Sequence, residues 1–179
     1  MQILDLKQSY FELFELDLTF EIDLKRLSSA QQRLQAVYHP DRFVNASEQD
    51  KRLSVQQASW INEAFETLSK PVKRARYMLE LSGLELNDES ETTSDTTFLM
   101  EQIALREEIE ECRTNADPPG CCDHIMDKLR SKADQFGSEF IANFDQGQLD
   151  DARISSRKMQ FIQRILEQLI DFQLELEEG

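Results

Sequence analysis

The chain has 179 residues, of which 40% are hydrophobic, and only five glycines and four prolines, so it can form one ordinary domain or two small ones. Its formal net charge is −15, with 10 basic and 11 acidic side chains in residues 1–75 but 10 and 24 in residues 76–179. Nucleic-acid phosphates require clustered lysines and arginines, and anionic lipid surfaces repel an acidic chain, so we expect protein partners.

No apolar run approaches the roughly 18 residues of a membrane span, and residues 1–6 carry no basic leader, so a cytoplasmic protein is expected. The cysteines are odd in number and fit neither a disulfide framework nor C-x-x-C metal spacing, which favours reduced thiols: Cys112, Cys121 and Cys122. His39 and His124 are far apart and have no metal-ligating partner at the usual spacing. We therefore expect no metal and no cofactor.

Helical patterns with no period-two strand pattern predict an all-α protein, and the N-terminal half is expected to contain four helices. The first helix is expected at about 9–14, and a second after Asp23, whose side chain is placed to cap it. This second helix ends before Pro40, which lacks a backbone N–H and restricts the residue before it. A third helix is expected at 48–68 and a short fourth at 72–82, ending at Gly83.

Two amphipathic helices joined by a loop of about ten residues must lie antiparallel to bury both apolar faces. This places His39, Pro40 and Asp41 at the exposed tip of a hairpin. A His–Pro–Asp tripeptide alone indicates no more than a turn. The surrounding sequence makes the tripeptide more informative, because three segments follow in order at characteristic spacings: Tyr10–Phe14, Tyr38–Arg42 and Ile61–Pro71.

Together these segments resemble the J domain of DnaJ-type co-chaperones. The resemblance implies that the tip loop and the basic face of the second helix dock on the ATPase domain of a DnaK-class chaperone. Carried over to this chain, the chaperone-binding residues are Lys25, Arg26, Arg33, His39, Pro40, Asp41 and Arg42. Gln32, Gln35 and Ala36 stand where many J domains have more basic residues, and a merely solvated basic face is the alternative.

The second half predicts three helices, at about 95–115, 121–144 and from after 148 to about 176. Asp117-Pro118-Pro119-Gly120 is a strong break between the first two. Short connections make neighbouring helices antiparallel, so we expect an up-down-up three-helix bundle.

The helix at 95–115 has apolar side chains on two faces. Phe98, Leu105, Ile109 and Cys112 form the core stripe, whereas the opposite face carries Leu99, Met100, Ile103, Glu107 and Glu111. A three-helix bundle has no second core, so an apolar face bordered by carboxylates predicts an exposed partner site. The alternative is that this face packs on the J domain or on a second copy of the chain.

The segment 95–108 resembles the start of the C-terminal domain of the HscB family, the J-type co-chaperones of bacterial iron–sulfur cluster assembly. The resemblance implies an L-shaped pair of domains: a J domain at 1–78, a helix end and linker at 79–94, and a scaffold-binding three-helix domain at 95–179. It also implies two partners, the scaffold protein IscU and the chaperone HscA, whose ATPase it stimulates. The implied scaffold-binding residues are Leu99, Met100, Ile103, Glu107, Glu111 and Phe161.

Two other functions are alternatives to this expectation. A J-domain adaptor for a different client keeps the hairpin but changes the partner, and Ala104 replaces an acidic residue expected on the scaffold-binding face. An enzyme using His39 and Asp41 as an acid–base pair would need a pocket that excludes water, which a hairpin tip does not offer. We expect a non-enzymatic, monomeric adaptor, with weak self-association through the apolar face left open.

Overall fold

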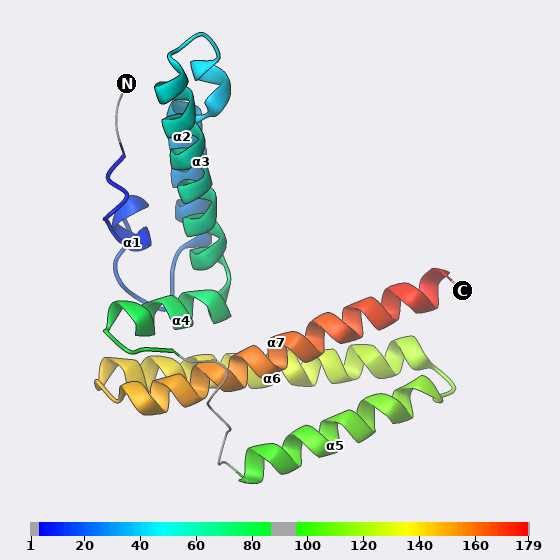
Figure 1. The fold of residues 1–179 in the computed structure, drawn as a ribbon. Coiled ribbons are helices and arrows are strands. Elements are labelled where there is room, and N and C mark those ends of the chain that lie inside the picture. Colours follow the sequence, from blue (N-terminus) through cyan, green and yellow to red (C-terminus); the bar gives the residue numbers. More distant parts are fainter. Residues whose placement is uncertain (1–3, 87–95, 179) are drawn as a thin grey trace. The chain divides into compact units, whose positions relative to one another are not determined.

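The computed structural model describes residues 4–86 and 96–178, and every regular element in these ranges is helical, which confirms the all-α prediction. The chain divides into two compact units, Met1–Met78 and Leu79–Gly179. No helix in the described ranges is long and apolar enough to cross a membrane. The elements are α1 (Tyr10–Leu13), α2 (Leu24–Tyr38), η1 (Pro40–Phe43), α3 (Glu48–Ser69), α4 (Pro71–Leu81), α5 (Thr96–Arg113), α6 (Pro118–Asp145) and α7 (Leu149–Glu178) (Figure 1).

The first unit is built around the α2–α3 hairpin, whose helices lie side by side (Figure 1). The Asp23 carboxylate accepts hydrogen bonds from two backbone N–H groups at the start of α2, which confirms the predicted cap. Ser47 caps α3 in the same way. The buried side chains include Phe11, Phe14, Leu27, Ala30, Tyr38, Ile61, Ala64 and Leu68.

Helix α1 has only four residues and depends on tertiary contacts, because so short a helix is unstable alone. The Tyr10 ring stacks on Tyr77 with centroids 4.4 Å apart and meets Trp60 edge-on at 4.9 Å. The Tyr10 backbone N–H also donates to the Tyr77 hydroxyl at 2.9 Å. These contacts fix α1 against α3 and α4.

A buried arginine holds the start of α4 to the end of α3. The Arg74 guanidinium donates to the Leu68 carbonyl, one of the carbonyls left without a helical partner at the C-terminus of α3. It also lies 5.0 Å from the centre of the Phe20 ring. Burial lowers the pKa of Arg74 to about 10, so the group stays charged at neutral pH.

Helix α4 ends at Leu81, and the predicted stop at Gly83 follows two residues later, with a φ of +83° that is the left-handed conformation favouring glycine. The backbone N–H of Leu84 then donates to the Leu79 carbonyl, satisfying a group left open at the helix end. Of the expected linker at 79–94, residues 87–94 lie outside the described residues.

The second unit consists of α5, α6 and α7. Figure 1 shows α6 and α7 side by side along their length with α5 next to them. The predicted break at 117–120 is misplaced, because α6 begins at Pro118 rather than 121. Proline is tolerated there because the first helical N–H groups have no partner within the helix, and Asp117 accepts from the Gly120 N–H at 3.1 Å. The core includes Phe98, Leu105, Ile125, Leu129, Phe136, Phe140, Ile162, Ile165 and Leu169.

Glu66 gives the junction of α3 and α4 a testable pH signature. Hydrogen bonds from Lys73 at 2.5 Å and then Lys70 at 3.1 Å lower the pKa of the Glu66 carboxyl from 4.5 to about 2. A depressed folded-state pKa stabilises the fold above the ordinary value, and this contribution is lost as pH falls through about 2. An NMR titration should find the Glu66 midpoint near 2, and Lys73→Met should raise it more than Lys70→Met. An unchanged midpoint in Lys73→Met would contradict this assignment.

Candidate functional site: the hairpin tip and the outer face of α5

The hairpin tip is held by hydrogen bonds among its own residues. His39 closes α2 by donating its backbone N–H to the Gln35 carbonyl at 2.9 Å, and Pro40 begins η1. The Asp41 backbone N–H donates to His39 Nδ1 at 3.3 Å. The Asp41 carboxylate lies 3.6 Å from the same nitrogen. The side chains are 55% and 86% exposed, as predicted for a tip, and such exposure excludes a water-free catalytic site.

Arg42 has a structural contact that the sequence did not indicate. Its guanidinium donates to the Ala36 carbonyl in the last turn of α2, where carbonyls have no partner within the helix. Arg42 therefore fastens the loop after the tip back onto α2. A residue expected to contact a chaperone also positions His39 and Asp41.

The basic face of α2 is exposed but not uniform. Lys25, Arg26 and Arg33 are all exposed. The Arg26 guanidinium donates to the Glu15 carbonyl, which is turned toward it by a left-handed backbone at Glu15 with φ of 54°. Arg26 is thus also part of the fold of the first unit. Lys25 and Arg33 form no ion pair with any residue in the described ranges and remain available charges.

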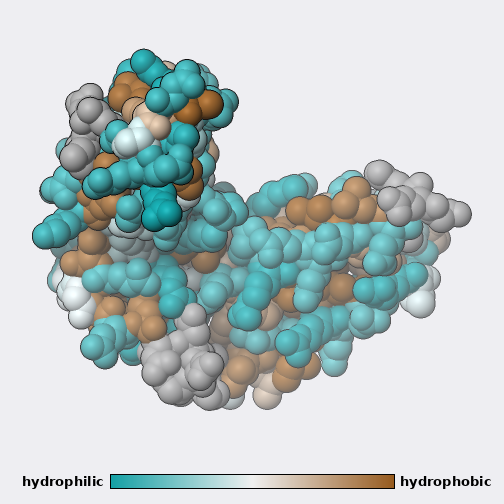
Figure 2. Space-filling view, turned by 45° about the horizontal axis from the view of Figure 1, so that its top comes forward, coloured by the Kyte–Doolittle hydropathy of each residue, from teal (hydrophilic) through white to brown (hydrophobic). Residues whose placement is uncertain are grey.

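On α5, the side chains expected to form the partner site lie outward. Leu99 is 40% exposed, Met100 63% and Ile103 53%, and Glu107 and Glu111 are exposed as well. The opposite stripe of the helix is buried at Phe98, Leu105 and Cys112. Hydrophilic side chains cover most of the face drawn in Figure 2, and apolar side chains reach the surface in separate patches. We call Leu99, Met100, Ile103, Glu107 and Glu111 the outer face of α5.

Phe161 does not emerge beside this face as expected, because it is only 8% exposed and belongs to the core. Its ring meets Phe98 edge-on with centroids 5.5 Å apart. It nevertheless lines a surface hollow of about 470 Å³ between α5 and α7, together with Leu99, Gln102 and Arg164. A ligand seated in this hollow would contact Leu99 and Phe161 together.

The expectation of three reduced thiols is wrong. Cys112 and Cys121 form a disulfide, and Cys122 is a buried free thiol. The disulfide is formed because α6 begins at Pro118, which puts Cys121 in its first turn, opposite the last turn of α5. Within the described ranges, no group of three or more His, Cys, Asp or Glu side chains is arranged to hold a metal ion.

Comparison with known proteins tests the resemblance carried by the sequence. The family described as "HSCB C-terminal oligomerisation domain" matches residues 94–170. The co-chaperone protein HscB homolog of Shewanella halifaxensis is 40% identical over 165 residues, which cover 90% of this chain and 94% of that protein. The chain belongs to the HscB co-chaperone family. This family is non-enzymatic, which confirms the expectation that the chain is not an enzyme.

Solved HscB structures support the same assignment. Chaperone HscB from Vibrio cholerae matches with a TM-score of 0.85 and 37% identity, covering 94% of this chain and 99% of that one. The crystal structure of human co-chaperone protein HscB matches with a TM-score of 0.86 and 27% identity, covering 98% of this chain and 87% of that one. The helical architecture is therefore that of the HscB family.

Phe161 is buried whereas the outer face of α5 is exposed, and stability measurements can test this difference. Phe161→Ala should lower the free energy of unfolding by about 3–5 kcal/mol, because it removes a buried ring and leaves a cavity. The triple variant Leu99→Ala/Met100→Ala/Ile103→Ala should change it by about 1 kcal/mol or less, because exposed substitutions have small effects. Urea unfolding followed by circular dichroism would measure both. A triple variant as unstable as Phe161→Ala would show that the outer face is packed.

Proposed function

We propose that this protein binds the iron–sulfur scaffold IscU through the outer face of α5, delivers it to the DnaK-class chaperone HscA and stimulates the HscA ATPase. The proposal is supported above all by the exposure of Leu99, Met100 and Ile103 on a helix whose other stripe is already buried. A contiguous apolar surface bordered by carboxylates is typical of a protein-binding site. Membership of the HscB family supports the choice of IscU and HscA as the two partners.

At the chaperone end, the tip presents a short rigid motif. Pro40 fixes the backbone, and the Arg42 bond to α2 limits the positions that Asp41 can take. An exposed carboxylate held in this way suits an arginine on the ATPase domain, because a carboxylate–guanidinium pair is specific and strong once desolvated. Lys25 and Arg33 would steer the encounter with an acidic surface.

Stimulation of the ATPase requires that the tip bind the hydrolysis-competent state of HscA more tightly than its resting state. The shift between the two states can be no larger than this difference in binding free energy. The contribution of the second unit is different in kind. Binding IscU to a chain that also binds HscA raises the local concentration of IscU at the chaperone.

At the client end, apolar contacts should dominate, with Met100 adapting its flexible side chain to the scaffold. Glu107 and Glu111 would pair with basic groups of IscU at the edge of the contact. Ala104 is exposed on this helix where the family resemblance implies an acidic residue, so the electrostatic contribution to client binding should be weaker here. In our proposal the protein acts as a monomer in the cytoplasm, with domain boundaries near 78 and 95.

One ATPase experiment separates the two ends. The rate of HscA hydrolysis is measured against the concentration of this protein, with and without IscU. Wild type and IscU together should stimulate more than the sum of their separate effects. His39→Gln should abolish stimulation in both conditions, because it removes the tip contact, while IscU binding measured by calorimetry remains. Leu99→Ala/Met100→Ala/Ile103→Ala should keep the basal stimulation and lose only the synergy.

A matched control is available on α7, where Ile170 and Leu174 are exposed to a similar degree. Ile170→Ala/Leu174→Ala removes two exposed apolar side chains from another helix and should behave as wild type. If the α5 triple variant retains full synergy, or if the α7 variant loses it, the outer face of α5 is not the scaffold site. Full stimulation by His39→Gln would contradict the assignment of the tip.

A further inference from the structure

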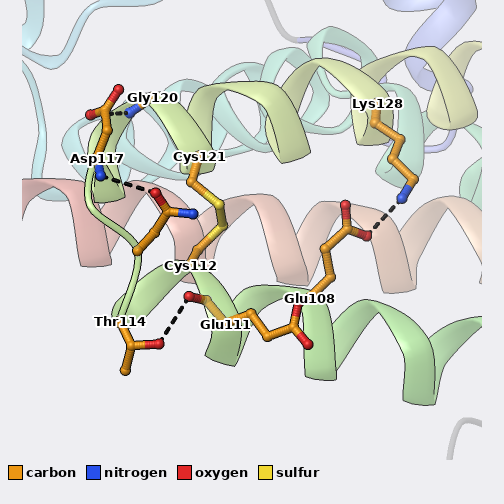
Figure 3. The surroundings of a disulfide bond; sticks show 9 residues. Glu108, Glu111, Cys112, Thr114, Asp117, Gly120, Cys121 and Lys128 are labelled. Atoms are coloured by element: carbon orange, nitrogen blue, oxygen red, sulfur yellow. Dashed lines mark hydrogen bonds and ion pairs between the residues drawn. A yellow bond between two sulfur atoms is a disulfide. The ribbon is translucent and has the colours of Figure 1, made fainter.

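The disulfide between Cys112 and Cys121 joins the last turn of α5 to the first turn of α6 (Figure 3). The two Cα atoms lie 5.6 Å apart, within the usual range for disulfides, and the cysteines are nine residues apart in sequence. The connection 114–117 is ordered by its own side chains: Asn115 accepts from the Asp117 N–H at 3.0 Å, and Asp117 caps α6. The helix ends are therefore held facing each other, and the bond can form without rearrangement of the backbone.

Only one of the two adjacent cysteines of α6 can take part. Consecutive helical residues point about 100° apart, so Cys121 faces α5 while Cys122 is turned into the core with no exposed surface. Burial, and secondarily the nearby Asp123 carboxylate, raise the pKa of the Cys122 thiol against a smaller opposing effect of Arg113. Because thiolates rather than thiols react, Cys122 does not compete for Cys112.

Helix α5 is attached to the rest of its unit by few contacts. It buries only Phe98, Leu105 and Cys112 among its 18 residues, whereas α6 buries seven. Two ion pairs join it to α6, Glu101 with Lys132 at 2.8 Å and Glu108 with Lys128 at 2.6 Å. Ion pairs near the surface each contribute little stability. Beyond Leu105, α5 is therefore held mainly by the disulfide and by Arg113, whose guanidinium lies 4.4 Å from the centre of the Phe172 ring.

We propose that Cys112 and Cys121 form a thiol–disulfide switch that clamps the C-terminal half of α5 to α6 and thereby sets the affinity of the outer face of α5 for its client. The identity of that client rests on the proposed function, whereas the clamp itself does not. Glu107 and Glu111 lie in the clamped half, and Ile103 lies just before it.

The oxidation is a two-electron thiol–disulfide exchange with a small-molecule disulfide such as oxidised glutathione. Cys121 is partly exposed and Cys112 is fully buried, so Cys121 is the point of entry. The Cys121 thiolate attacks the disulfide, forms a mixed disulfide and releases one thiolate. Cys112 then loses its proton, attacks the Cys121 sulfur and expels the second thiolate. Two protein S–H bonds are lost, one S–S bond forms, and both protons and electrons end on two small thiols; excess thiol reverses the sequence.

The disulfide changes the affinity for the client by changing how much of α5 must become ordered when the client binds. With the disulfide closed, the C-terminal half of α5 already has the conformation that presents Glu107 and Glu111. With the thiols reduced, part of the binding free energy is spent on ordering that half, so affinity falls. The oxidised protein is accordingly the tighter binder.

The first test needs no client. The full-length protein is equilibrated in mixtures of reduced and oxidised glutathione, alkylated and mapped by mass spectrometry, and amide hydrogen exchange is compared in the two end states. Oxidised protein should yield a linked Cys112–Cys121 peptide that reduced glutathione reverses. Amides of residues 105–113 should exchange about tenfold faster after reduction, with the centre of α7 unchanged. A pair that never oxidises, that excess thiol cannot reduce, or that leaves exchange in 105–113 unaffected would overturn the switch.

The second test titrates purified IscU into four proteins. Oxidised wild type and oxidised Cys122→Ala both have the closed disulfide and should bind IscU with the same affinity. Reduced wild type and Cys121→Ser lack the disulfide and should bind roughly fivefold more weakly. Equal affinity in all four would overturn the link between clamp and client. Absence of IscU binding in every form would instead contradict the proposed client, and the exchange comparison then decides the clamp alone.

Discussion

A unit of three helices has a single core, and α5 carries apolar side chains on two opposite faces. The inward stripe of Phe98 and Leu105 fills that core, and the Phe98 ring meets Phe136 and Phe161 edge-on. Leu99, Met100 and Ile103 are then left in water because no second core exists for them. Exposed apolar surface of this kind is unfavourable in the isolated molecule and becomes favourable when a partner covers it. Because only one of its two apolar faces reaches the core, α5 is held by few buried side chains. The disulfide therefore contributes much of the attachment of the C-terminal half of α5.

The first unit meets a different requirement, since its functional groups must be exposed and still held in place. Pro40 ends α2, the Asp41 N–H bonds to His39 Nδ1, and Arg42 returns to the Ala36 carbonyl, so the loop is ordered by backbone contacts rather than by burial. Arg26 also has two roles, because its charge lies on the predicted docking surface and its guanidinium holds the turn at Glu15. Substituting Arg26 or Arg42 therefore removes a contact that orders the backbone of the first unit as well as a positive charge.

Much of this architecture could be predicted because it depends on local chemistry. Pro40 must end a helix, Asp23 caps one, Gly83 takes a left-handed conformation, and the inward stripe of α5 follows from helical periodicity. The errors concern relations between elements. Helix α6 begins three residues early because Pro118 and Pro119 suit a first turn as well as a break, and that shift brings Cys121 opposite Cys112. Phe161 lay at the edge of a helical wheel, and only packing against Phe98 decides that it is buried.

In our proposal, two separate surfaces, one on each unit, bind two different proteins. Backbone amide chemical shifts of the isotope-labelled full-length protein test it most directly, with IscU and ATP-loaded HscA added in separate titrations. IscU should perturb residues 99–111 and leave 25–42 unchanged, whereas HscA should perturb 25–42 and leave 99–111 unchanged. Perturbation of one common set of residues by both proteins, or of 25–42 by IscU alone, would contradict the account.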